Sequence, residues 1–141
     1  MRFMILIKAD KHSEAGEMPD EKLLTDMGRF NTELVEAGVM QAGEGLHPSS
    51  KSVRVRFMAT SSEVVRGPFP IQEVICGFWI WKLASMEEAI AWVKRVPNPL
   101  QGDYEIEIRP ICEAEDFGDE FTPELRAEEE RLRAKLEQSG S

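Results

Sequence analysis

Two stretches of the chain are apolar at almost every position, and they predict the centre of a sheet. Residues 2–8 put apolar side chains on both faces of a strand, and residues 75–83 do the same with Trp79 and Trp81 on one face. A strand that is apolar on both sides has to be covered on both sides. We therefore expect both stretches to be central strands.

Apolar residues recur at helical spacing in two further segments. The first helix is expected to begin near Pro19 and to stop at Gly38, after a polar loop over residues 10–18. The second follows a capping box, in which Ser85 precedes Glu88, and ends before Pro97. The apolar positions expected to be buried are Leu23, Met27, Phe30, Leu34, Ala37, Met86, Ala89, Ile90 and Val93.

The remaining strands are marked by alternation and by turn residues. Residues 39–46 predict a strand that contains Gly43 and Gly45, where the backbone bends or is approached closely. Residues 52–57 alternate as a half-exposed strand, with a hairpin tip at 59–63. A turn over 98–103 and a charged edge strand over 104–111 complete the series.

This order of elements predicts an α+β fold, an antiparallel sheet with two helices on one face. The helices cover only one side, whereas the central strands are apolar on both sides. The second face therefore requires a partner. We expect a homodimer in which two sheets pack face to face and form a shared, barrel-like core.

Charge is concentrated at the end of the chain. The net charge is -9, and residues 113–141 carry ten acids and four bases. We expect residues 1–112 to form the domain and residues 113–141 an acidic extension, with a helix near 122–138 that begins at Thr122-Pro123. An acidic chain lacks the basic face that nucleic acid binding needs.

The location is predicted from what the sequence contains. No window is as long and apolar as a membrane span, and the start has no cleavage site typical of a signal peptide. Cys76 and Cys112 lie in strand-like segments without a second cysteine at metal or redox spacing. We expect reduced thiols, a cytoplasmic protein, and no bound metal or cofactor, since no nucleotide, zinc or serine-hydrolase motif occurs.

Three groups of motifs together resemble one family. They are the opening strand Phe3-Met4-Ile5-Leu6-Ile7; the segment Ala37-Gly38-Val39 with Gly43-Glu44-Gly45-Leu46-His47-Pro48; and Gly67-Pro68-Phe69 with Glu73, Gly77-Phe78, Glu87-Glu88-Ala89 and Glu105-Ile106-Glu107-Ile108-Arg109-Pro110. The chain resembles the YCII-related domain family in its DGPF-motif branch over roughly residues 1–112. The resemblance implies a dimeric α/β-barrel of ferredoxin-like topology.

Two positions depart from the family pattern. Arg66 stands where the acid that opens the DGPF motif is expected, which reverses the charge there. Residues 19–37 contain no histidine, so the helix histidine of the dyad-bearing branch has no counterpart. Both departures argue against dyad chemistry of the kind suggested for some members of the family.

The candidate site residues flank two turns. His47 is the candidate general acid or base and Glu44 its orienting carboxylate, while His12 in a polar loop is the weaker candidate. Arg66, Phe69 and Glu73 are candidate ligand-binding residues. Each has a structural alternative: a surface histidine, a solvent-facing strand acid, a surface ion pair between Arg66 and Glu63 or Glu73, and a core plug at Phe69.

Three functions fit these residues. The first is a small-molecule-binding or regulatory dimer with a cleft beside the turns at 43–48 and 66–73. The second is an enzyme in that cleft with His47 as general acid or base. The third is a protein-interaction module that recruits a partner through the acidic tail. Trp79 and Trp81 are expected in the core or at the dimer interface rather than as a stacking wall for a ligand.

Overall fold

The structure is a computed structural model that describes residues 1–97 and 104–140. The chain divides into two units, Met1–Pro110 and Ile111–Ser141. The boundary at residue 112 and the extension beyond it remain predictions from the sequence, and the turn expected over 98–103 lies outside the described residues. None of the helices in the described ranges combines the length and apolarity that crossing a membrane requires.

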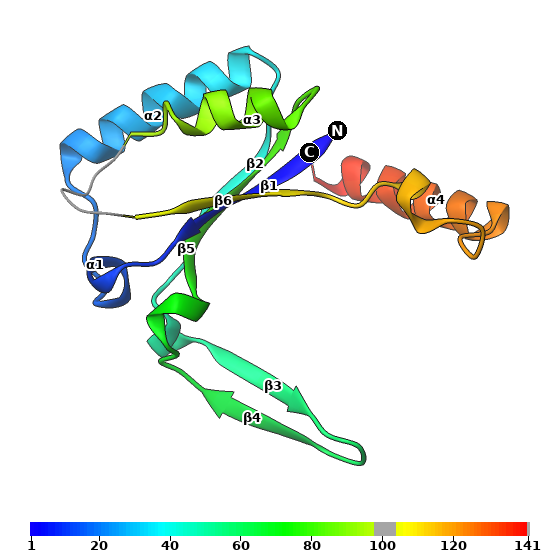
Figure 1. Cartoon of the computed structure of the whole chain (residues 1–141), viewed down its shortest axis with the longest axis horizontal. Coiled ribbons are helices and arrows are strands. Elements are labelled where there is room, and N and C mark those ends of the chain that lie inside the picture. Colours follow the sequence, from blue (N-terminus) through cyan, green and yellow to red (C-terminus); the bar gives the residue numbers. More distant parts are fainter. Residues whose placement is uncertain (98–103, 141) are drawn as a thin grey trace. The chain divides into compact units, whose positions relative to one another are not determined.

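The first unit is built on an antiparallel sheet. Its strands are β1 (Arg2–Lys8), β2 (Met40–Gly45), β5 (Ile75–Lys82) and β6 (Ile106–Pro110), in the order β2-β5-β1-β6. Helix α2 (Glu21–Glu36) precedes β2 and helix α3 (Met86–Val93) precedes β6, and Figure 1 shows both on the same side of the sheet. This confirms the α+β, ferredoxin-like fold. The two apolar runs are the central strands, and β6 is the charged edge strand that was predicted.

Both helices start at the residues that cap them. The Asp20 carboxylate accepts a hydrogen bond from the backbone N–H of Leu23 at 2.8 Å, so α2 begins just after Pro19. The Ser85 hydroxyl accepts one from the Glu88 N–H at 3.2 Å, as predicted. The Glu88 carboxylate accepts from the Ala84 N–H at 3.1 Å instead of the Ser85 N–H, so the reciprocal half of the predicted capping box does not form.

Two expectations about burial in the helices are wrong. Ala37, the C-cap of α2, is exposed because the helix ends there. Ile90 is 41% exposed, because α3 turns Ala89 toward the sheet instead.

The hydrophobic core lies between the helices and one face of the sheet. Trp81, Phe3, Ile5 and Leu34 are its largest fully buried side chains. Phe30 of α2 stacks edge-on against Trp79 and Trp81, with ring centroids 5.8 and 6.3 Å apart. Such edge-to-face contacts add to the stabilisation from area burial. The interpretation of the tryptophan stripe as core is therefore confirmed.

Among the described residues of the first unit, none forms a helix on the opposite face of the sheet. Met4 pairs with Ile80 and Leu6 with Phe78, so these four side chains alternate with the core residues and share the outer face. All four are partly exposed. Strands β1 and β5 are thus apolar on both faces, as the sequence indicated. A shared dimeric barrel over this face remains a prediction.

A separate hairpin extends the first unit. Strands β3 (Val53–Phe57) and β4 (Ser62–Arg66) form their own two-stranded sheet (Figure 1). Every residue of β3 is exposed rather than half-exposed, and Phe57 is 82% exposed. An isolated two-stranded ribbon has little stability of its own in water. The hairpin is therefore held mainly at its base.

At that base, a hydrogen-bond network surrounds Ser49, which is 5% exposed. Its backbone N–H donates to Glu14 Oε1 at 2.9 Å and its hydroxyl donates to Glu14 Oε2. The same hydroxyl oxygen accepts a bond from the Phe69 N–H at 3.0 Å. Glu14 belongs to a short helix, α1 (Lys11–Glu14), where a loop had been expected. This network joins the segment after β2 to the turn at Gly67-Pro68-Phe69, which contains a cis Gly67–Pro68 bond.

The second unit consists of a 3₁₀ turn (Ala114–Phe117) and helix α4 (Pro123–Ser139). Thr122 caps α4 by accepting from the Leu125 N–H at 3.2 Å, which confirms the predicted start. Within the unit, Phe117 stacks on Phe121 and Arg126 pairs with Glu115 at 3.6 Å. The leucines of α4 are exposed, in agreement with the thin apolar stripe in the sequence: Leu125, Leu132 and Leu136.

Replacing Gly67 by alanine is expected to destabilise the protein. A Cβ at Gly67 would stand 1.8 Å from the Ser49 carbonyl oxygen, so the backbone at Ser49 or at Gly67 has to shift. We expect the Gly67→Ala variant to lose about 1–3 kcal/mol of unfolding free energy in urea denaturation.

The matched control is Gly28→Ala, in the middle of α2, where a Cβ meets nothing within 4 Å. This variant is expected to gain about 0.5–1 kcal/mol, because alanine loses less backbone entropy in a helix. Equal stability of the two variants would contradict the packing described at Gly67.

Candidate functional site

A pocket of about 1010 Å³ opens between helix α2 and the end of the sheet where β1 finishes and β5 begins. Its walls come from several elements: Leu23, Met27 and Asn31 of α2, the loop around α1, Val96, Pro97 and Tyr104. A pocket of this size is large enough for a metabolite. All of these residues belong to the first unit.

Glycines help to form this pocket because they place no side chain on this part of the sheet. Gly43 pairs with Trp79 and Gly45 pairs with Gly77, so the glycines share the helix-facing side of the sheet with the tryptophans. A Cβ at Gly45 would meet nothing within 4 Å, whereas one at Gly43 would stand 2.6 Å from Trp79 Cδ1. Gly43 therefore gives the indole room to pack, and Gly45 leaves open space.

Trp79 is at once a core residue and a wall of the pocket. It is 4% exposed, and its indole Nε1–H donates to Asn31 Oδ1 at 3.0 Å. An indole nitrogen can only donate, so this bond fixes which end of the Asn31 amide faces Trp79. The amide NH₂ of Asn31 is consequently the end left for other partners at the pocket wall.

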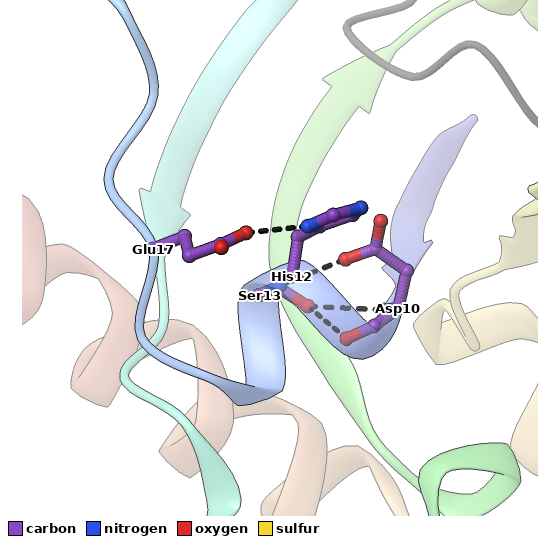
Figure 2. Close-up of polar contacts among 4 residues, drawn as sticks. All are labelled: Asp10, His12, Ser13 and Glu17. Atoms are coloured by element: carbon purple, nitrogen blue, oxygen red, sulfur yellow. Dashed lines mark hydrogen bonds and ion pairs between the residues drawn. The ribbon is translucent and has the colours of Figure 1, made fainter.

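A short loop around α1 forms the polar rim. Asp10 caps α1 by accepting from the Ser13 N–H at 2.8 Å, and the Ser13 hydroxyl donates to the Asp10 carbonyl at 3.0 Å. His12 Nδ1 contacts the Glu17 carboxylate. Figure 2 shows the imidazole of His12 directed toward Glu17, above the Asp10–Ser13 cap. The four side chains line the pocket.

Two weak acids of the pocket hold their protons more tightly than usual. Burial raises the pKa of the Cys76 thiol; a hydrogen bond with Ser13 opposes the rise, and the carboxylates of Asp10 and Glu14 add to it. Burial also raises the pKa of Tyr104, with a smaller contribution from Cys76. Both groups are therefore neutral at physiological pH. Cys76 is a structural thiol that donates to the Lys8 carbonyl at 3.7 Å, and not an activated nucleophile.

The sequence-predicted site residues do not gather in this pocket. Glu44 is among the lining residues, but it pairs with Phe78 and so alternates with Gly43 and Gly45 toward the other face of the sheet. His47 and Arg66 are exposed and are not among the described lining residues. Their roles in catalysis or ligand binding remain predictions.

Phe69 and Glu73 instead surround one arginine of the hairpin. Arg54 Nη1 pairs with Glu73 Oε1 at 2.9 Å, and its guanidinium carbon lies 3.9 Å from the centre of the Phe69 ring. Glu63 pairs with Arg56 at 3.2 Å, so both acids considered for Arg66 are paired with arginines of β3. This cluster attaches the hairpin to the turn at 67–69. Phe69 is half-buried there.

The residues missed by sequence reasoning are those of the α1 loop. Residues 10–18 have no apolar periodicity, so they were assigned to a loop and His12 received less weight than His47. One signal was present. Asp10 and Ser13 have the spacing of an N-cap with its reciprocal partner, which marks a helical turn just before His12 and Glu17.

The raised pKa of Cys76 predicts slow alkylation. A thiol whose pKa lies above the ordinary value of 9.0 forms little thiolate at pH 8, and thiolate is the reactive form. Cys112 is exposed. With iodoacetamide at pH 8 we expect the Cys112→Ser variant to react slowly and the Cys76→Ser variant quickly, measured by mass spectrometry. The rate at Cys76 should still rise above pH 9; a plateau below pH 9 would contradict the burial described.

Comparison with known proteins agrees with the fold. A family model described as the YCII-related domain matches residues 1–115. An uncharacterized protein from Rhizobium meliloti (strain 1021) is 30% identical over 96 residues, which span 66% of this chain and 76% of that protein. The match contains the sheet, both of its helices, the hairpin and the pocket. Because the family model matches residues 1–115, this chain belongs to the YCII-related domain family.

Proposed function

We propose that this YCII-related protein is a small-molecule-binding or regulatory domain of the DGPF-motif branch that acts in the cytoplasm as a homodimer. The observation that carries the proposal is that Gly45 and Gly77 place no side chain on the sheet beside Trp79. A sheet that carries large aromatic residues at one end and none at the other leaves a cavity under its helix. The two cysteines are free, which fits a reducing compartment.

Binding is favoured over turnover by the protonation of the pocket. The thiol and the phenol that line it keep their protons, since burial raises the pKa of Cys76 and of Tyr104. Proton transfer near neutral pH needs a group with a pKa near that pH. His12, beside Glu17, is a histidine of the lining, and it is half-exposed rather than enclosed.

The alternative is an enzyme that uses His47 as general acid or base, oriented by Glu44. His47 lies outside the lining of the pocket, so this role requires a second site on the surface after β2. Loss of turnover with unchanged ligand binding in a His47→Ala variant favours the enzyme. Capture of a partner that disappears on deletion of residues 113–141 favours an interaction module instead.

The homodimer of the proposal uses the outer face of the sheet. Met4, Leu6, Phe78 and Ile80 form an apolar strip there, partly exposed in the single chain. Charged side chains of β6 border this strip, since Arg109 pairs with Met4 and Glu107 with Leu6. An apolar centre with a charged border is the usual anatomy of a protein interface. A two-fold axis lets one copy of the strip cover the other.

Filling the pocket at Gly45 is expected to abolish ligand binding without unfolding the protein. In a thermal-shift screen against metabolites, a ligand at about one hundred times its Kd stabilises the native state by about 2.7 kcal/mol. The side chain in Gly45→Leu enters open space, so the variant should keep its own melting temperature and lose the shift.

Gly45→Ala is the matched control, because it adds only a methyl group to the same position and should retain most of the shift. A ligand that shifts the wild type and Gly45→Leu equally binds somewhere else. That result would contradict the proposed pocket.

The dimer is expected to depend on Ile80. Multi-angle light scattering of the wild type at micromolar concentration should give twice the mass of the 16.0 kDa chain. Ile80→Glu puts a charge in the apolar strip and should give monomers, because burying an unpaired carboxylate costs several kcal/mol.

The same substitution at the exposed Ile90 of α3 should leave the dimer intact and controls for added charge. A monomeric wild type would contradict the proposed interface, and so would an Ile80→Glu variant that remains a dimer.

A further inference from the structure

The lining of the pocket is divided between an apolar floor and an acidic rim. We call the apolar part of the lining the floor, and it includes Ile7, Met27, Trp79 and Val96. The rim is formed by the loop around α1 and by the first turns of α2. Five carboxylates and two lysines occur among the described lining residues: Asp10, Glu17, Asp20, Asp26, Glu44, Lys8 and Lys22. Glu44 is directed toward the other face of the sheet, so the charge facing a ligand depends on which of the remaining groups are already paired.

Both lysines of the lining are engaged with acids. Lys22 Nζ lies 3.0 Å from Asp26 Oδ2, one turn along α2. Lys8 Nζ lies 3.6 Å from Glu107 Oε1, which is not among the lining residues. Each lysine still has N–H donors left, but a carboxylate already offsets its charge, so an anionic ligand gains less attraction from it. Such a ligand would also approach the other carboxylates without compensation.

The rim carboxylates, in contrast, each keep one oxygen available. Asp10 and Asp20 use Oδ1 to cap α1 and α2, at 2.8 Å from the N–H groups of Ser13 and Leu23. Asp26 uses Oδ2 for Lys22, and Glu17 uses Oε2 for His12. Within the described part of the chain, the second oxygen of each has no hydrogen-bond donor. A carboxylate has roughly four acceptor sites, so these oxygens can take further N–H donors.

We propose that the pocket selects an organic cation: a primary ammonium or guanidinium group on an apolar body. The inference rests on the proposed function, because it names the ligand of the same pocket. The apolar body packs on the floor beside Trp79, and the cationic head donates hydrogen bonds to the free oxygens of the rim. Hydrogen bonds between a cation and a carboxylate are about twice as strong as neutral ones. Walls of low dielectric focus the field of the acids into the pocket.

A bare metal cation fits the same charge less well. No group of three or more His, Cys, Asp and Glu side chains in residues 1–97 and 104–140 is arranged to hold a metal ion. The apolar floor also contains no carboxylate, imidazole or thiol that could be a ligand of a metal ion. A quaternary ammonium has the charge but no N–H to donate, so it separates attraction by charge from hydrogen bonding to the rim.

The test uses probes with one body and different heads: phenylbutylamine, phenylbutanol, phenylpentanoate and phenylbutyltrimethylammonium. The readout is the indole N–H resonance of Trp79 in a nitrogen-15 correlation spectrum of the full chain. Trp81 and Trp92 do not line the pocket, so their indole signals serve as internal controls. We expect the amine to move the Trp79 signal and to bind about tenfold more tightly than the alcohol and the acid.

Two variants test the rim without touching the helix caps. Glu17→Gln and Asp26→Asn each remove a charge and keep a hydrogen-bonding side chain. Each should weaken the amine about three- to tenfold and leave the alcohol unchanged. Glu87→Gln removes an exposed charge from α3, outside the lining, and should change neither.

The outcomes separate this inference from the proposed function. If the acid or the alcohol binds as tightly as the amine, and Gly45→Leu abolishes that binding, the pocket is real and the selection for a cation is overturned. If the quaternary ammonium matches the amine, hydrogen bonding to the rim is overturned. If no probe moves Trp79 at millimolar concentration, the cation proposal fails, and the metabolite screen with Gly45→Leu then decides the pocket independently.

Discussion

The structure depends on an abrupt change of side-chain size along one face of β5. At one end of that face Trp81 and Trp79 are buried in the core, and at the other end Gly77 lines the pocket without a side chain. Strand β2 repeats the change beside it, since Gly43 accommodates Trp79 and Gly45 faces Gly77. The same helix, α2, and the same sheet therefore form both the close-packed core and the open pocket. A helix held rigidly by aromatic contacts at one end cannot collapse onto the glycines at the other.

This division also explains why the polar residues gather where they do. The loop around α1 and the N-cap of α2 lie over the glycine end, so Asp10, Glu17 and Asp20 face a pocket instead of bulk solvent alone. Carboxylates near helix N-termini are favoured by the free N–H groups there. The same groups that start the helices therefore give the pocket its charge.

The fold could be predicted from the sequence because its signals are local and strong. Apolar runs on both faces identified β1 and β5, and alternation identified β6 as an edge strand. Ser85 marked the start of α3, and Pro19 marked the start of α2 to within two residues. The outward position of Ile90 could not be predicted, because α3 is short and its contact with the sheet is made by Ala89. The exposure of β3 was also missed, since alternation does not reveal whether a strand has a sheet to pack on.

The site was harder to predict than the fold for a physical reason. Sequence reasoning weighted residues beside turns, such as His47, Arg66 and Glu73, whereas the pocket is produced by residues without side chains. Two glycines in β2 indicated a close backbone approach, but not which face of the sheet was open or what lay above it. Only the register Gly45–Gly77 and the position of α2 convert those glycines into a cavity.

A crystal structure of the protein under xenon pressure would show directly whether the pocket beside Trp79 exists. Xenon enters preformed apolar cavities without needing a specific ligand. We expect a xenon site on the apolar floor, between Gly45, Trp79 and Met27. A structure in which Leu23 and Met27 pack directly on Gly45 and Gly77, with no xenon between them, would contradict it.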